Sequence, residues 1–327
     1  MVPKIHTMSN ISVKKLRDVI KFYRSNTEQK TLEVFNLTNE SLHRYLRKAQ
    51  KMGIPTVNKN TVLEKISERF TDKELLAIAE GGRLLPGIGK VPIVDFEGER
   101  IRFTLTGDFH LGSMFTNPEH VFMMYEESRK AGSEFIAVGG DVCEGMSNRP
   151  GHVYELSHIG YDAQKSHAKA ILGEWDRTMY LIDGNHDRWF IKSSGAHIVS
   201  DLCELLGERF IYLGHDEGDI SLKGKSTIKL WHGEDGNSYA ISYRVQKIIE
   251  SLTGGAKPGI LSCHHVHKFN YIFERHIHAI SPGCIQMQSK WMRGKRIAAH
   301  TGFVICDAWV NKQGIAKVNI CWHPFYS

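Results

Sequence analysis

Residues 179–187 read MYLIDGNHD, a run of apolar residues that ends in Gly184-Asn185-His186-Asp187. A short apolar run followed by glycine and polar side chains is typical of a buried strand that ends in a functional loop. A specified tetrapeptide of this kind arises by chance in a chain of this length at a frequency of about two in a thousand. The stretch therefore predicts a strand whose loop presents an amide, an imidazole and a carboxylate.

Four further polar clusters follow strand-like runs in the same way. Each brings carboxylate or imidazole groups directly after the apolar residues: Asp108 and His110, Asp141 and Glu144, His232, and finally His264, His265 and His267. Loops at strand ends collect functional groups. Carboxylate, imidazole and one amide are the ligands expected for divalent metals that activate water, rather than for a structural zinc site.

Strand and helix patterns alternate around these clusters. Strands are predicted at 91–96, 101–106, 135–138, 178–182, 227–231, 259–263, 276–280 and 302–307, and helices at 118–131 and 162–174. This order predicts a layered α/β domain with two packed sheets.

Taken in order, the five clusters resemble the signature of the calcineurin-like metallophosphoesterases. The matching elements are D-x-H at 108–110, G-D-x-x-[DE] at 140–144, G-N-H-[DE] at 184–187, a lone histidine at 232 and H-x-H at 265–267. The resemblance covers residues 91–327 and implies a four-layer αββα sandwich, in proteins of the phage and bacterial type. It also implies a hydrolase that cleaves phosphoric ester bonds with a hydroxide activated by two divalent metal ions.

The resemblance assigns roles to individual residues. It implies two sets of ligands, with Asp141 bridging: Asp108, His110, Asp141 and His267 for one metal, and Asp141, Asn185, His232 and His265 for the other. It gives His186 a catalytic role as general acid or transition-state stabiliser. Asp187 would orient His186 or its loop. Mn²⁺ is the favoured metal on resemblance, with Fe, Zn²⁺ and Mg²⁺ as alternatives.

Two further histidines, His264 and His152, have no ligand role in this resemblance. His264 occupies a position where the resembling family has glycine, and it is expected either to point to solvent or to add a group near the metals. His152, which lies between the second and third clusters, is expected to be a surface histidine.

The N-terminal part of the chain is strongly basic and helical. Residues 1–60 carry twelve Lys and Arg against four Asp and Glu, a local charge of +8, whereas the whole chain has +6, which leaves −2 for residues 61–327. Residues 27–53 resemble a helix-turn-helix module, and the exposed face of its last helix displays Arg44, Arg47, Lys48 and Lys51. These side chains are the candidate DNA-binding residues. The alternative is a packing domain with an ordinary solvated surface.

These observations predict a helix-turn-helix domain at 1–60, a helical linker at 61–90 and a phosphoesterase domain at 91–327. The favoured function is phosphodiester hydrolysis in DNA, as a nuclease or end-processing enzyme. Candidate substrate contacts at the rim of the site are Asn148, Arg149, Trp291 and Arg293. Two alternatives stay open. One is an enzyme acting on nucleotides, cyclic nucleotides or other small phosphoesters, with the N-terminal domain for regulation or dimerisation; the other is a DNA-binding protein with an inactive phosphoesterase domain.

The sequence also bears on location and assembly. It lacks an 18-residue apolar run and a signal-peptide pattern, so no membrane association and a cytoplasmic location are expected. The six cysteines are scattered without a C-x-x-C pair, which argues against disulfides and a thiolate zinc site. A homodimer is left open.

Overall fold

The computed structural model describes residues 12–52, 54, 56, 58, 91–234, 240–253 and 257–326. The chain divides into two compact units, residues 1–86 and 87–327, and each is described by itself. The helical linker expected at 61–90 lies outside the described residues. Among the residues described, the search for a helix of sufficient length and apolarity to span a bilayer finds none.

The N-terminal unit contains three helices, α1 (Val13–Tyr23), α2 (Glu28–Phe35) and α3 (Asn39–Lys51). Each begins at a hydroxyl residue whose side chain accepts a hydrogen bond from the first turn: Ser12, Thr27 and Thr38. One apolar face of α1 packs on one of α3, through Leu16, Val19, Ile20, Leu42, Tyr45 and Ala49. The predicted all-α character of this unit is confirmed, whereas its use in DNA binding stays a prediction.

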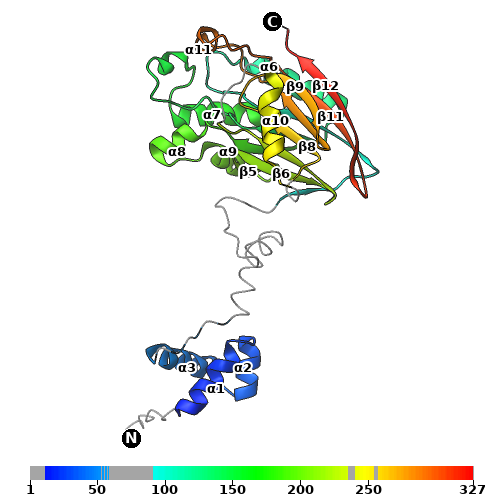
Figure 1. Ribbon diagram of the computed structural model, residues 1–327. Coiled ribbons are helices and arrows are strands. Elements are labelled where there is room, and N and C mark those ends of the chain that lie inside the picture. The colour runs from blue at the N-terminus through cyan, green and yellow to red at the C-terminus, as the bar shows by residue number, and fades with distance from the viewer. Residues whose placement is uncertain are drawn as a thin grey trace. The chain divides into compact units, whose positions relative to one another are not determined.

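The larger unit is built on two sheets (Figure 1). The first contains, in spatial order, β1 (Ile93–Val94), β6 (Glu217–Leu222), β7 (Ser226–Trp231), β8 (Ile260–Cys263), β10 (Ile277–Pro282) and β9 (Phe269–Glu274). The second contains β12 (Gly314–Pro324), β11 (Gly302–Asn311), β2 (Arg100–Thr106), β3 (Phe135–Gly139), β4 (Thr178–Asp183) and β5 (Phe210–His215). The helices of this unit are α6 (Pro118–Ala131), η1 (His152–Glu155, a 3₁₀-helix), α7 (Tyr161–Leu172), α8 (Arg188–Ser194), α9 (Ile198–Leu206), α10 (Ile241–Ser251) and α11 (Lys290–Gly294).

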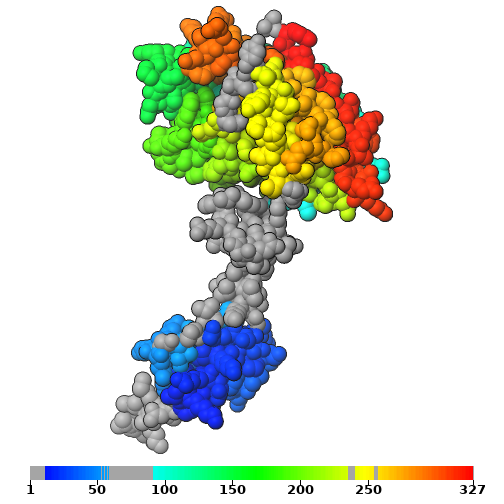
Figure 2. Space-filling model, in the orientation of Figure 1, coloured from blue at the N-terminus to red at the C-terminus, as the bar shows by residue number. Residues whose placement is uncertain are grey.

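The buried apolar residues define four layers. Alternate residues of β2 and β3 face the other sheet, where Phe103, Leu105 and Ala137 pack with Ile228 and Ile260. The opposite face of the second sheet is covered by α6, α7 and α9. The outer face of the first sheet is covered by α10, which lies at the surface in yellow in Figure 2. This order of layers confirms the expected αββα sandwich.

Candidate metal centre

The five predicted clusters meet at one edge of the sandwich. β2, β3 and β4 run parallel in one sheet, and β7 and β8 run parallel in the other. Because carboxyl ends of parallel strands lie on the same side, the loops after all five strands come together. The structure thus brings every residue predicted as a metal ligand into one site: Asp108, His110, Asp141, Asn185, His232, His265 and His267.

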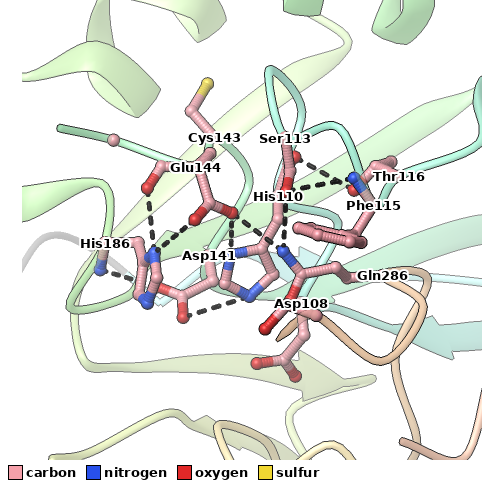
Figure 3. A network of polar contacts seen from close by, with 12 residues as sticks. Asp108, His110, Ser113, Phe115, Thr116, Asp141, Cys143, Glu144, His186 and Gln286 are labelled. Atoms are coloured by element: carbon pink, nitrogen blue, oxygen red, sulfur yellow. Dashed lines mark hydrogen bonds and ion pairs between the residues drawn. The ribbon is translucent and has the colours of Figure 1, made fainter. Parts of the chain in front are cut away.

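The first group of ligand atoms surrounds Asp108, with His110 and His267 on either side. His267 Nε2 lies 3.3 Å from Asp108 Oδ1. The Nε2 atoms of His110 and His267 are only 3.2 Å apart, and His110 Nε2 is 3.6 Å from Asp141 Oδ2. Figure 3 shows His110 next to Asp141 in this arrangement.

The second group surrounds the other side of Asp141 and includes His232 and His265. His232 Nε2 lies 3.2 Å from Asp141 Oδ2 and 3.0 Å from Asn185 Oδ1. The backbone N–H of His265 donates to both oxygens of Asp108, at 3.1 and 3.3 Å. Asp141 Oδ2 therefore lies between the two groups, 3.6 Å from His110 Nε2 of the first and 3.2 Å from His232 Nε2 of the second, as the bridging role would require.

Five of these residues have a left-handed backbone, which costs energy for any residue with a side chain. They are Asp108, His110, Asp141, His265 and His267, with φ between 48° and 78°. Such strain concentrates at functional sites, where the surrounding structure holds the chain in place. The local geometry is thus that of a site shaped for ligand contacts rather than of ordinary loops.

The donor atoms fit a divalent cation. His232 Nδ1 lies 2.8 Å from the carbonyl oxygen of Gly139, so Nδ1 carries a hydrogen, and in the neutral form of the ring that binds a metal the Nε2 lone pair faces Asp141 and Asn185. Burial opposes a charge on Asp141, but His232 and His186 hold its pKa well below the usual range. Burial also opposes protonation of His232, yet the Asp141 carboxylate raises its pKa to about 9, and the same negative charge attracts a metal cation.

His186 lies beside these two groups and forms a third group of close ligand atoms with His110 and Glu144. Its Nδ1 is 2.8 Å from the carbonyl oxygen of Glu144, and its backbone N–H donates to Asp141 Oδ1 at 2.8 Å. The ring packs on Trp189 with centroids 3.9 Å apart. Burial lowers the pKa of His186, with Asp141 acting in the opposite direction.

Asp187 holds the backbone of two loops together. Its buried carboxylate accepts hydrogen bonds from the N–H groups of Val142, Cys143 and Gly184, at 3.1, 2.8 and 2.9 Å. It therefore joins the loop after β3 to its own loop after β4. Of the two expectations for Asp187, this geometry favours orientation of the loop over direct contact with the His186 ring.

His264 is buried, so the expectation that it points to solvent is wrong. Its Nε2 is 2.8 Å from Ser262 Oγ, and its Nδ1 is 3.7 Å from Asp108 Oδ2. The ring occupies space left by two glycines: a methyl group at Gly107 would lie 2.5 Å from His264 Nδ1, and one at Gly139 would lie 1.9 Å from Cδ2. The extra imidazole thus packs behind the metal ligands.

Four residues of the site have contacts that sequence reasoning missed. Glu144 contacts His110, and Gln286 donates to Glu144. His152 is buried rather than at the surface, which corrects the expectation, because its ring also contacts Glu144. Arg244 of α10 donates to the carbonyl oxygens of His232 and His264. Only Glu144 had a sequence signal, as the last residue of its motif.

The predicted rim residues lie on two neighbouring segments. Asn148 and Arg149 precede η1, and Trp291 and Arg293 belong to α11. The Arg149 guanidinium is 5.8 Å from the centre of the Trp291 ring and is paired with Glu155 at 2.6 Å. Figures 1 and 2 show α11 beside the green segment that contains η1.

The four predicted DNA-binding residues lie on α3 of the N-terminal unit. Arg44, Arg47 and Lys51 are exposed and Lys48 is half-buried. They occupy the side of the helix opposite Leu42, Tyr45 and Ala49, as the periodicity predicts.

No family model matches the chain. Among curated proteins it is similar to the DNA polymerase II small subunit of Methanothermobacter thermautotrophicus, at 22% identity over 308 residues, 78% of this chain and 63% of that protein. The match thus spans less than two thirds of the relative's length.

Among solved structures, the chain is similar to a novel archaeal phosphodiesterase, at 12% identity with a TM-score of 0.40, over 68% of this chain and 100% of that one. It is also similar to vacuolar protein sorting 29 of Cryptosporidium parvum, at 13% identity with a TM-score of 0.38, over 70% and 100% of the two chains. A zinc complex of Vps29 from Entamoeba histolytica matches at 14% identity with a TM-score of 0.34, over 69% and 100%. Function has to be argued from the residues of the site.

Proposed function

We propose that this chain is a metal-dependent phosphoesterase of the calcineurin-like type that hydrolyses phosphodiester bonds, with DNA as its substrate. The observation that carries the proposal is the convergence of carboxylate, imidazole and amide groups from five loops on two adjoining groups of ligand atoms, with Asp141 between them. Two neighbouring groups of oxygen and nitrogen donors are suited to a pair of metal ions that activate water for phosphoester hydrolysis, rather than to a single structural metal.

Asp108, His110, Asp141 and His267 would hold one divalent cation, and Asp141, Asn185, His232 and His265 would hold the other. Two bound cations supply activation of water and neutralisation of negative charge on the phosphoryl oxygens. The chain's own contribution is to hold the ligand atoms rigidly, through strained backbone, the Asp187 hydrogen bonds and the His232 bond to Gly139. Mn²⁺ is the metal we favour.

His186 would assist departure of the leaving oxygen. Because Nδ1 is directed at the carbonyl oxygen of Glu144, the proton available for transfer is on Nε2. Burial lowers the pKa of this ring, so the protonated form gives up its proton more readily than an exposed histidine does. Contact with Trp189 fixes the plane of the ring.

The choice of DNA as substrate rests on charge and on the curated relative. The charge of +8 over residues 1–60 attracts a polyanion, and three of the basic side chains are exposed on α3. The relative's name, a DNA polymerase small subunit, supports the same choice. Trp291 and Arg293, both exposed, offer a base-stacking ring and a phosphate contact at the rim, and Asn148 and Arg149 lie opposite them.

A substrate panel tests the proposal. Purified protein with Mn²⁺ is assayed on single- and double-stranded oligonucleotides, cyclic nucleotides, mononucleotides and a chromogenic phosphodiester, with Asp141→Asn as the control that removes the shared ligand. Hydrolysis of oligonucleotides that is lost in Asp141→Asn is expected. Cleavage of the chromogenic diester without any cleavage of DNA would refute the DNA substrate and leave the small-molecule alternative. Failure on every substrate with every metal would favour the inactive, DNA-binding alternative.

The choice of metal has its own test. Elemental analysis of protein purified without chelator is expected to find manganese. Zinc and iron at one equivalent each would overturn this choice without affecting the phosphoesterase assignment.

A further inference from the structure

The carboxyl group of Glu144 lies buried between both imidazoles to which the proposed function gives a role in chemistry. Glu144 Oε2 is 2.9 Å from His110 Nδ1, a close electrostatic contact that is not aligned as a hydrogen bond. The main-chain oxygen of the same residue is 2.8 Å from His186 Nδ1. Figure 3 shows Glu144 in contact with both rings. One residue therefore sets the orientation of a predicted metal ligand and of the predicted acid.

Glu144 is itself held by His152 on one side. His152 is fully buried, and its Nδ1 accepts a hydrogen bond from the backbone N–H of Ser147 at 3.2 Å. The ring hydrogen is therefore on Nε2, which lies 2.9 Å from Glu144 Oε1. The contact is thus a directed hydrogen bond from a neutral ring to the carboxylate.

Gln286 holds the other carboxylate oxygen. Its amide nitrogen donates to Glu144 Oε2 at 2.9 Å and to Ser113 Oγ at 3.1 Å, so both amide hydrogens are used. The backbone N–H of Gln286 also donates to the carbonyl oxygen of Asp108 at 3.2 Å. Each carboxylate oxygen of Glu144 therefore accepts a hydrogen bond from a residue other than His110 and His186.

This arrangement has a defined effect on His110. The negative charge of Glu144 beside Nδ1 favours the tautomer with the hydrogen on that atom, and in this tautomer the Nε2 lone pair is directed at the position between His267 and Asp141. Groups that fix the far side of a metal-binding imidazole in this way set its tautomer and strengthen metal binding. The His110 and His186 rings meet edge to face at 4.5 Å, so displacement of one would displace the other.

We propose that His152 and Gln286 are positioning residues of the centre: by fixing the Glu144 carboxylate they set the tautomer and orientation of His110 and, through the contact between the two rings, the orientation of His186. The inference rests on the proposed function, because it gives these two imidazoles their roles there. Neither His152 nor Gln286 belongs to the motifs on which the resemblance depends. Both lie on the segments that carry the rim: His152 is three residues from Arg149 along the chain, and Gln286 is five residues from Trp291.

Gln286→Met and His152→Leu remove the donors and keep most of the side-chain volume. Mn²⁺ affinity is measured by isothermal titration calorimetry, and kcat and KM are measured on the chromogenic phosphodiester. We expect a fall in Mn²⁺ affinity of about 10–100-fold and a lower kcat. KM should change little, because neither side chain is placed against substrate. His152→Gln, whose amide nitrogen replaces the ring Nε2, should recover most of both quantities.

Gln288→Met is the matched control, since the amide of Gln288 donates to the carbonyl oxygen of Ile297 and not to Glu144. It should bind Mn²⁺ as the unaltered chain does. Circular dichroism checks that each variant is folded; should Gln286→Met unfold, the comparison of His152→Leu with His152→Gln carries the test.

Equal Mn²⁺ affinity and kcat in the two donor-removing variants and in Gln288→Met would overturn the positioning role while the phosphoesterase assignment stood. The same experiments also distinguish the opposite case, in which the proposed function fails and the positioning role holds. If the chain hydrolyses no phosphodiester but the order of Mn²⁺ affinities holds, the proposed function fails and the positioning of His110 is supported.

Discussion

Gly139 is the last residue of β3, and the space above its Cα is filled by the buried ring of His264. A methyl group there would lie 1.9 Å from Cδ2 and 2.0 Å from Nε2 of that ring, far inside van der Waals contact. At residue scale, an unusual histidine behind the ligands and the absence of a side chain at Gly139 are therefore two parts of one packing arrangement.

Gly139→Ala should lower the free energy of unfolding by about 3 kcal/mol, because the added methyl group displaces a buried ring. His264→Ala removes the atoms it would meet, so the double variant should be more stable than the sum of the single effects predicts, by about 2 kcal/mol. Urea unfolding followed by circular dichroism measures all three. Gly294→Ala is the control, since a methyl group there meets nothing within 4 Å. Additive effects of the two substitutions would contradict the packing account.

The sequence was enough to predict the site residues that belong to short motifs. Asp108 and His110 form one such motif, and Asn185 and His186 form another. Each motif directly follows an apolar run that predicts a strand, and loops at the same end of parallel strands are expected to meet. The burial of His152 and His264 could not be predicted, because it depends on how the loops fold. His152 packs on Glu144 and Ser147 of its own loop region, whereas His264 packs on Gly107 and Gly139, which are far away along the chain.

At element scale, most of the predicted strands are interior strands of the two sheets, although the edge strand β1 was predicted and the interior strand β6 was not. The eight predicted runs fall on β1, β2, β3, β4, β7, β8, β10 and β11, whereas β5, β6, β9 and β12 were not predicted. β5, β9 and β12 are edge strands, and their residues are mixed in burial, so their hydrophobic pattern is weak. The site could still be predicted because its loops follow central strands.

Helix α10 contributes directly to the centre through Arg244. This buried guanidinium donates to the carbonyl oxygens of His264 at 2.9 Å and His232 at 2.7 Å, and thereby joins the loops that follow β8 and β7. Arg244→Met should leave both carbonyl groups without these donors. We expect a loss of about 3 kcal/mol in stability and a fall in Mn²⁺ affinity of about tenfold or more.

Arg244→Lys should restore little, because an ammonium group lacks the planar fork that reaches two carbonyl oxygens at once. Lys247→Met on the same helix is the matched control, since Lys247 is exposed and pairs with Glu250. Calorimetric Mn²⁺ titration and thermal unfolding test both statements. Wild-type metal affinity in Arg244→Met would show that α10 has no part in the centre.

Asp307 joins three strands of the second sheet and makes part of its stability depend on pH. From β11 it contacts Arg100 at 2.8 Å and Arg102 at 2.7 Å, both on β2, and Asn319 of β12 at 3.3 Å. Burial would raise the pKa of Asp307, but the hydrogen bonds from Arg102 and Arg100 hold it below the ordinary value of 3.8. The carboxylate therefore stabilises the fold fully above that value, and loses this effect as the pH falls through the lower folded-state pKa.

Asp307→Asn should cost about 2 kcal/mol at pH 7, since it removes charge-assisted hydrogen bonds. The difference from the unaltered chain should shrink as the pH is lowered below 3.8. Urea unfolding at several pH values measures it, with Asp95→Asn in the exposed segment between β1 and β2 as the control. A difference that stayed constant across this range would mean that the ionised carboxylate is not the stabilising form.

At the scale of the whole molecule, charge is divided between the two units. Residues 1–60 carry +8 and the remainder of the chain carries −2, so a polyanion is attracted to the N-terminal unit and not to the protein in general. If α3 binds DNA, removal of its exposed cations should weaken binding and make it less dependent on salt. The candidate metal centre should be unaffected, because it lies in the other unit.

Replacement of Arg44, Arg47 and Lys51 of α3 by Ala tests this division of labour. Its matched control is replacement of Lys14, Lys15 and Arg17 of α1, which are also exposed and remove the same charge from the same unit. DNA affinity is measured by fluorescence anisotropy between about 50 and 200 mM salt. In the α3 variant, the slope of log affinity against log salt concentration should become shallower by about one for each phosphate contact removed, and in the α1 variant it should change much less. kcat on the chromogenic phosphodiester should be unchanged in both. Equal losses in the two variants would mean that only net charge matters and that α3 is no recognition helix, while an unchanged α3 variant would place DNA binding elsewhere in the chain.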